Sequence, residues 1–236
     1  MRKPKMKSKE YTSLTKITGV FNHTGLDGAG KGTQIAAFAA KLNAAGYETH
    51  VCKAYCDKEK KKWEPTVNKL LRCKAVGDFL VTVLFQMFHR KQVTEALNER
   101  KKGKIVVADR WDEGFLAYHR QNGFLAKTPN VRRALLGHGF QGYIPHKTVF
   151  YDLDPTVAKE RMMSRGSMDG FDAKPSEHHT KMRHGFKNIA EERDWITVDA
   201  HQDIEAIANE VWQLLLPTIL SLDTVDIFET ISASEV

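Results

Sequence analysis

A glycine-rich segment, residues 25–33, constrains this chain more than any other feature. It reads Gly-Leu-Asp-Gly-Ala-Gly-Lys-Gly-Thr, follows an apolar run over residues 17–24, and opens a segment with apolar residues on one stripe, residues 31–45. This is the pattern G-x-x-x-x-G-K with the strand and the helix that a phosphate-binding loop needs on its two sides. Glycines let the backbone fold around an anion, and the helix amino terminus adds the positive end of its dipole. The segment therefore predicts a site for nucleotide phosphates.

Lys31 is the cation of this loop that can reach the outer phosphates. Gly32 stands where the pattern expects Ser or Thr, and Thr33 follows one place later. Because the hydroxyl that normally contacts Mg²⁺ is absent at that position, we expect Mg²⁺ to be held through water, the nucleotide phosphates and a carboxylate from another segment. The residues expected to bind ATP are Gly25, Asp27, Gly28, Ala29, Gly30, Lys31, Gly32 and Thr33.

Strand and helix patterns alternate along the rest of the chain. Apolar runs predict five strands, at residues 17–24, 47–52, 104–109, 148–153 and 195–198. Helical patterns cover residues 31–45, 64–101, a segment starting near 112, 129–140, 155–165, 175–193 and 203–220. This alternation predicts right-handed crossovers, and so an α/β fold in which helices cover both faces of a five-stranded parallel sheet.

Length and composition fit one domain of this kind. Of the 236 residues, 42% are hydrophobic and 28% are charged, which is typical of a soluble globular protein. We expect a basic tail over residues 1–14, the domain over residues 15–221 and a second tail over residues 222–236. The net charge of +7 is concentrated in residues 1–10 and 53–62, which together account for the whole excess. A basic tail and one basic segment do not predict a nucleic-acid-binding face.

The sequence also indicates the compartment. The longest apolar stretch, residues 79–88, is interrupted by Thr82 and Gln86 and is shorter than the ~18 residues that a membrane helix needs. The three cysteines cannot all pair with one another, and no histidine cluster stands near them at zinc-ligand spacing. We therefore expect a cytoplasmic protein with no membrane partner.

Three motifs together resemble those of the thymidylate kinases, a family of P-loop nucleoside monophosphate kinases. They are the loop with its following Gln34, the segment Asp109-Arg110-Trp111 at the end of an apolar run, and Asp-Leu-Asp-Pro over residues 152–155, followed by Arg161 and Arg165. The resemblance extends from about residue 17 to 220. It implies the P-loop NTPase fold with a short lid at about residues 162–175, ATP as phosphoryl donor, Mg²⁺, and a homodimer. The implied reaction converts dTMP to dTDP.

Elementary chemistry supports the same catalytic roles. Asp109 ends a buried strand, where ligands of open α/β sheets bind, and its carboxylate suits the water shell of Mg²⁺. Arg161 and Arg165 are four residues apart, so they share a helix face and can close together on the transferring phosphoryl group. With Lys31, these three are the candidate catalytic residues. Arg110 offers a planar fork for the acceptor phosphate.

The candidate acceptor-binding residues are Asp27, Lys53, Phe85, His89, Arg90, Arg110 and Tyr118. In the family, an acidic loop residue and an aromatic residue lie near the acceptor sugar, which the resemblance carries to Asp27 and Tyr118. The family's Phe-x-x-x-Arg, which holds the acceptor base, is changed here to Phe85 with His89 and then Arg90. One residue of offset rotates a helical side chain by about 100°, so His89 and Arg90 cannot both replace that arginine.

Two further departures affect specificity and catalysis. Lys53 is the only residue that could keep a phosphate-directed charge where the family often has Arg-Glu-Pro, and Gly28 stands where one branch of the family has a catalytic arginine. The second change shifts the expected catalytic charge to the lid. Two alternatives therefore stay open: a kinase of another nucleoside monophosphate, and a P-loop nucleotide switch or ATPase that binds nucleic acid.

Overall fold

A computed structural model describes residues 14–54, 62–63, 65–67, 69–70, 77–164 and 175–222. The expected basic tail over residues 1–14 lies outside this part of the chain except for Leu14, and the expected tail over residues 222–236 lies outside it except for Leu222. Most of the expected lid, including Arg165, also lies outside the described residues.

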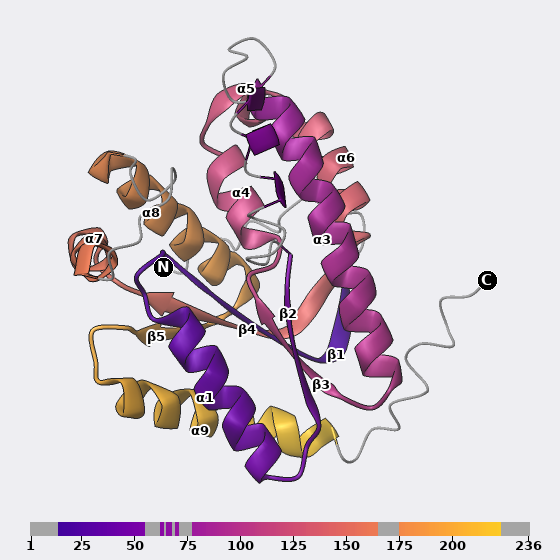
Figure 1. The fold of residues 1–236 in the computed structure, drawn as a ribbon, viewed down its shortest axis with the longest axis vertical. Coiled ribbons are helices and arrows are strands. Elements are labelled where there is room, and N and C mark those ends of the chain that lie inside the picture. The colour runs from indigo at the N-terminus through magenta and orange to yellow at the C-terminus, as the bar shows by residue number, and fades with distance from the viewer. Residues whose placement is uncertain are drawn as a thin grey trace, which may run out of the picture.

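The sheet confirms the expected fold class. Its strands are β1 (Thr15–Gly25), β2 (Thr49–Lys53), β3 (Ile105–Asp109), β4 (Tyr143–Asp152) and β5 (Ile196–Asp199). They form one five-stranded sheet in the order β2-β3-β1-β4-β5, and every neighbouring pair is parallel (Figure 1). β1 is therefore central, and its carboxyl end leads directly into the glycine-rich loop.

Helices cover both faces of this sheet. They are α1 (Lys31–Ala44), α3 (Gly77–Lys101), α4 (Glu113–His119), α5 (Gly123–Lys127), α6 (Pro129–Phe140), α7 (Pro155–Ser164), α8 (Ser176–Arg193) and α9 (Ile204–Leu222). α1 and α9 pack together on one face, while α3 and α8 lie on the other, with α4 and α6 packed against them (Figure 1). None of the helices in the described residues is long and apolar enough to cross a membrane.

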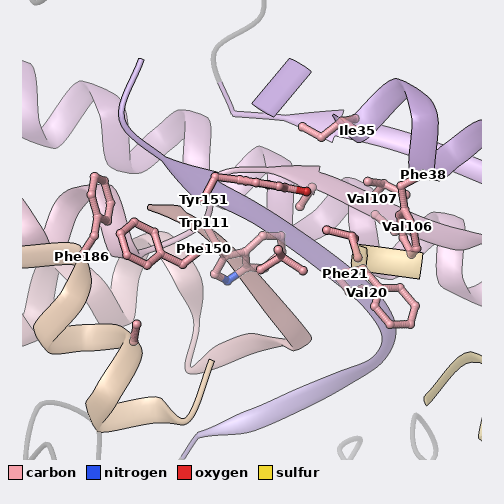
Figure 2. Close-up of a cluster of buried hydrophobic side chains, with 14 of the residues drawn as sticks. Val20, Phe21, Ile35, Phe38, Val106, Val107, Trp111, Phe150, Tyr151 and Phe186 are labelled. Atoms are coloured by element: carbon pink, nitrogen blue, oxygen red, sulfur yellow. The ribbon is translucent and has the colours of Figure 1, made fainter. Parts of the chain in front are cut away.

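Aromatic side chains fill the space between the sheet and these helices. Phe21 of β1 meets Phe38 of α1 edge to face, with ring centroids 5.7 Å apart, whereas Phe150 of β4 packs on Phe186 of α8 at 5.9 Å (Figure 2). Adjacent residues of a strand point to opposite faces, so Tyr151 lies on the α1 side. The core therefore holds the carboxyl ends of β1 and β4 rigidly beneath the loop.

A histidine lies in this core next to the loop. His23 is fully buried, its Nδ1 is 2.7 Å from the Tyr151 hydroxyl, and its ring packs on Phe38. Burial lowers the pKa of His23 to about 3, since a charged imidazole is disfavoured away from water. His23 is thus a neutral part of the packing at physiological pH.

Two details differ from the sequence prediction. β4 begins at Tyr143, not at residue 148, because residues 143–145 pair with residues 15–17 before a shift of register interrupts the β1–β4 ladder. Pro145, His146 and Lys147 break the apolar run there, so the pattern gave no signal for a strand. The single-turn helix α5 was not predicted either, since five residues are too few to show a helical period.

Candidate active site

The sheet register brings three functional segments together at its carboxyl edge. Lys53 at the end of β2 pairs in register with Asp109 at the end of β3, and Asp109 pairs on its other side with His23 of β1. The loop begins two residues after His23. Candidate residues far apart in the sequence therefore meet because parallel strands end at one edge.

The loop takes a backbone conformation that depends on its glycines. Gly28 has φ 84° and Gly30 has φ 82°, both in the left-handed region that side chains disfavour. Gly30 is the residue before α1, which has no side-chain cap, so the amino end of the helix is left facing the loop. Such a helix end, with its unpaired N–H groups, is the expected anion-binding element.

Asp27 joins the two cations of the site. Its Oδ1 accepts a hydrogen bond from Arg110 Nη2 at 2.7 Å and one from Lys31 Nζ at 3.2 Å. Lys31 Nζ also donates to the backbone oxygen of Leu26 at 2.9 Å. The predicted phosphate lysine and the predicted acceptor arginine are thus held by one carboxylate.

The charges in this group perturb one another. Burial opposes ionisation of Asp27, but Arg110 and Lys31 outweigh it and hold the pKa of Asp27 well below its usual range. For Lys31, burial and then the neighbouring Arg110 lower the pKa below its ordinary value. An anion placed between Lys31 and Arg110 would relieve this repulsion, so the site is electrostatically suited to phosphate.

Asp109 fits the expected contact to hydrated Mg²⁺. Its Oδ2 lies 2.9 Å from Lys53 Nζ, while its Oδ1 is buried with no hydrogen-bond partner in the described part of the chain. Burial opposes ionisation, yet Lys31 and Lys53 lower the pKa of Asp109, so the carboxylate is charged. The described residues contain no group of three or more acidic, His or Cys side chains that could hold a metal ion directly. The charged Oδ1, which lacks a partner in this part of the chain, could accept a hydrogen bond from a water molecule bound to Mg²⁺.

Four candidate acceptor residues lie on α3 and α4, and their contacts include side chains or backbone of α3, α6 and α8. His89 lies against Phe140 of α6, with ring centroids 4.6 Å apart, and burial lowers its pKa to about 4. Arg90 donates to the His138 carbonyl on the surface, at 3.1 Å. Phe85 packs edge to face on Phe88, and Tyr118 contacts His178 of α8. The helical offset between His89 and Arg90 therefore sends one side chain inward and the other outward.

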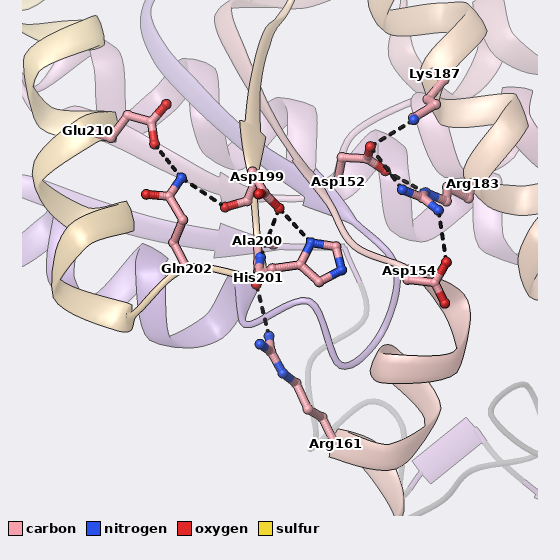
Figure 3. A network of polar contacts seen from close by, with 10 residues as sticks. All are labelled: Asp152, Asp154, Arg161, Arg183, Lys187, Asp199, Ala200, His201, Gln202 and Glu210. Carbon is pink, nitrogen blue, oxygen red and sulfur yellow. Dashed lines mark hydrogen bonds and ion pairs between the residues drawn. The ribbon is translucent and has the colours of Figure 1, made fainter.

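Arg161 is held at a different place. Its Nη1 donates to the carbonyl oxygen of Ala200, after β5, at 3.1 Å (Figure 3). Asp152 at the end of β4 accepts a hydrogen bond from Arg183 Nε of α8 at 2.6 Å and lies 2.8 Å from Lys187 Nζ (Figure 3). The structure thus connects the two helices that flank the expected lid, α7 and α8, to the carboxyl ends of β5 and β4.

Sequence reasoning did not find several residues that shape this site. Gln92 of α3 donates to the Arg110 carbonyl, and Arg183 holds Asp152. Glu113 accepts the Trp111 N–H with both carboxylate oxygens, at 2.9 and 3.0 Å. No local motif marks Gln92 or Arg183, because their partners are distant in the chain. Glu113 is only two residues after Trp111, so its hydrogen bond with the Trp111 N–H could have been predicted from their spacing in the sequence.

Gly28 and Gly30 offer a matched test of the contact between the loop and α7. A Cβ at Gly28 would overlap the backbone oxygen of Ala158 in α7, whereas a Cβ at Gly30 meets nothing within 4 Å. Both residues have similar positive φ, so the backbone penalty of alanine is about 1 kcal/mol at either position. We expect Gly30→Ala to lower the free energy of unfolding by about that amount and Gly28→Ala by about 3 kcal/mol, because overpacking adds to it. Urea unfolding of both variants measures this, and equal losses would contradict the observed contact between loop and α7.

Comparison with known proteins agrees with this arrangement. The family model for thymidylate kinase matches residues 24–211 of this chain. The chain is 28% identical to the thymidylate kinase of Deinococcus radiodurans, over 80% of this chain and 91% of that protein. It is 30% identical to the thymidylate kinase of Tropheryma whipplei, over 79% and 90%, and 29% identical to that of Exiguobacterium sibiricum, over 83% and 93%. With the loop, the parallel sheet and the Asp-Arg turn in place, the chain belongs to the thymidylate kinase family.

Proposed function

We propose that this protein transfers the γ-phosphoryl group of ATP to dTMP, which yields ADP and dTDP. The single observation that carries the proposal is the cluster of Lys31, Asp27 and Arg110 at the mouth of the glycine-rich loop. In this proposal Lys31 serves the donor phosphates and Arg110 the acceptor phosphate, which is supported by the contact of both cations with the carboxylate of Asp27. Family membership supports the choice of dTMP as acceptor.

The donor side consists of the loop and the start of α1. Backbone N–H groups of residues 28–33 would hold the ATP phosphates, and Lys31 would leave Asp27 to bind the outer ones. Because burial lowers the pKa of Lys31, a phosphate group beside it would favour the charged form of its ammonium group.

On the acceptor side, Arg110 would take the dTMP phosphate. An acceptor phosphate oxygen attacks the γ-phosphorus, the bond from that phosphorus to the ADP leaving oxygen breaks, and charge spreads over the γ-phosphoryl oxygens. Lys31 and Arg110 stabilise this charge from the two sides. When both bind phosphate, Asp27 is released and can accept a hydrogen bond from the acceptor sugar.

Mg²⁺, when bound, neutralises charge on the donor phosphates. Asp109 would hold it through water, with the unpartnered Oδ1 as acceptor for that water. Lys53 lies on the other oxygen of the same carboxylate and is half exposed, so it can turn toward an incoming phosphate. We propose that it adds acceptor affinity in this way.

The expected lid gives the remaining catalytic charge. We propose that residues 162–175 close over the bound nucleotides and exclude water, which prevents hydrolysis of ATP. Arg165 would then supply a cation to the transferring group. Arg161 donates a hydrogen bond to the Ala200 carbonyl and would stay in place at the base of the lid while the lid closes. The domain boundaries proposed here are residues 15–221, flanked by the two tails.

The acceptor base would lie along α3 and α4, beside Phe85 and Tyr118. With a lowered pKa, His89 is neutral and cannot supply the charge of the arginine that the family has at this position. Recognition of the base would then depend on stacking and shape more than on charge.

We further propose that the protein is a cytoplasmic homodimer. Phe79, Leu80 and Met87 of α3 expose 38%, 40% and 59% of their surface, which leaves apolar area on an outer helix. A buried free thiol at Cys52 fits a reducing compartment. Light scattering of the purified protein should report about twice the mass of one chain, and the mass of a single chain would contradict the dimer.

A coupled assay of ADP release tests the function. MgATP is supplied with dTMP, dUMP, dGMP, dAMP, dCMP or a ribonucleoside monophosphate, and one reaction contains no acceptor. We expect the highest kcat/KM with dTMP. A higher value with another nucleotide would reassign the acceptor, and ADP release independent of any acceptor would favour a nucleotide switch or ATPase.

A further inference from the structure

The backbone at Arg110 is held in a conformation that it does not favour. Arg110 has φ 69°, and among the described residues the other non-glycine residues with positive φ are Gln141 and Asp194. Those two are the C-caps of α6 and α8, where a left-handed residue is common. Arg110 instead follows a buried strand. Its conformation has to be imposed by neighbouring groups.

Hydrogen bonds fix both peptide groups of Arg110. Its N–H donates to the His23 carbonyl at 3.1 Å, and its carbonyl accepts from Gln92 Nε2 at 2.8 Å. Gln92 lies on α3, is 1% exposed, and comes from a different element than the turn that it holds. The guanidinium then reaches Asp27 at 2.7 Å and lies over the Phe186 ring at 6.0 Å. The direction of the Arg110 side chain thus depends on a turn that α3 fastens.

We propose that Gln92 is a positioning residue for acceptor binding: its amide N–H holds the Arg110 carbonyl and so keeps the guanidinium aimed at the phosphate site. This inference rests on the proposed role of Arg110. A side chain of equal length without a donor would leave that carbonyl unsatisfied and allow the turn to relax toward ordinary φ values. The guanidinium would then move away from the loop, while the donor side around Lys31 would be unaffected.

The same helix provides a matched control. Gln86, six residues earlier on α3, is also fully buried, and within the described residues neither atom of its amide group has a hydrogen-bond partner. Gln92→Met and Gln86→Met therefore both remove a buried amide group from α3, but only the first removes a hydrogen bond to Arg110. For Gln92→Met we expect the KM for dTMP to rise roughly tenfold with the KM for ATP within about twofold of the unchanged protein. For Gln86→Met we expect both KM values to stay within about twofold.

A double variant separates positioning from a general structural effect. If Gln92 acts through Arg110, Gln92→Met combined with Arg110→Ala should raise the KM for dTMP no further than Arg110→Ala alone. Additive effects would overturn the proposal, and so would an equal rise in both KM values or a response of Gln86→Met as large as that of Gln92→Met.

A second substitution covers the case in which Gln92→Met does not fold. Gln92→Glu keeps the length of the side chain but can donate to the carbonyl only when protonated. Its KM for dTMP, divided by that of the unchanged protein at each pH, should fall as the pH is lowered from about 7.5 to about 6, since burial raises the pKa of a carboxyl group. A ratio that does not change with pH would overturn the proposal. If the unchanged protein does not turn over dTMP, the proposed function is wrong and so is this inference. If it turns over dTMP and Gln92→Met has an unchanged KM for dTMP, only the inference is contradicted.

Discussion

Lys31→Met should lower kcat for dTMP phosphorylation by about three orders of magnitude or more, because the lysine neutralises charge that develops on the transferring group. The same substitution should not destabilise the protein. Burial and the neighbouring Arg110 lower the pKa of Lys31, so the charge of its ammonium group is disfavoured. Replacement by an apolar side chain of similar length should leave the thermal midpoint unchanged or raise it. Steady-state kinetics and thermal unfolding measure the two effects.

Lys41 is a suitable control for that experiment. It lies on the same helix and donates to Asn209 of α9 at 2.6 Å, far from the loop contacts. Lys41→Met should retain normal kcat. Near-normal turnover by Lys31→Met, or an equal loss in both variants, would contradict the role of Lys31.

Arg110→Ala should raise the KM for dTMP roughly a hundredfold while the KM for ATP changes little. Two charge-assisted hydrogen bonds to a phosphate are worth about 3 kcal/mol or more together, which corresponds to that factor. The loss should be specific to the acceptor because Lys31 keeps its contact with the loop backbone at Leu26. Initial rates with each substrate varied at saturation of the other will separate the two KM values.

Arg120→Ala provides the comparison. Arg120 follows α4 and pairs with Glu192 of α8 at 2.9 Å, and its side chain is 20% exposed, close to the 27% of Arg110. Loss of this ion pair should leave both KM values within about twofold, as surface ion pairs contribute little. Should Arg110→Ala raise the KM for ATP as much as that for dTMP, Arg110 would belong to the donor side.

The sequence predicted the parts of the fold that depend on local pattern. The glycine-rich loop, the helix after it and all five strands followed from apolar runs and from residues such as Gly30 and Lys31. The start of β4 did not, because its first residues join the sheet through pairing with residues 15–17, and the sequence around Pro145 carries no alternation. Pairing between distant segments decides such boundaries.

The sequence likewise predicted only part of the candidate site. Strand ends are predictable, so Asp109 and Arg110 were placed correctly at the carboxyl edge of the sheet. The sequence did not predict which carboxylate binds which cation. Asp27 reaches Arg110 because of the positive φ at Arg110 and the register of β1 with β3. The sequence also did not predict which of His89 and Arg90 points inward, because this depends on the packing of α3 on α6, which turns His89 onto Phe140.

Following the labelled phosphoryl group directly tests whether this protein transfers the γ-phosphoryl group of ATP to dTMP. ATP labelled at the γ-phosphorus is incubated with the protein, Mg²⁺ and dTMP, and the labelled nucleotides are separated. We expect the label to appear in dTDP, its appearance to require dTMP, and Lys31→Met to abolish it. Label found only in inorganic phosphate, or remaining in ATP while dTMP is present, would contradict phosphoryl transfer by this site.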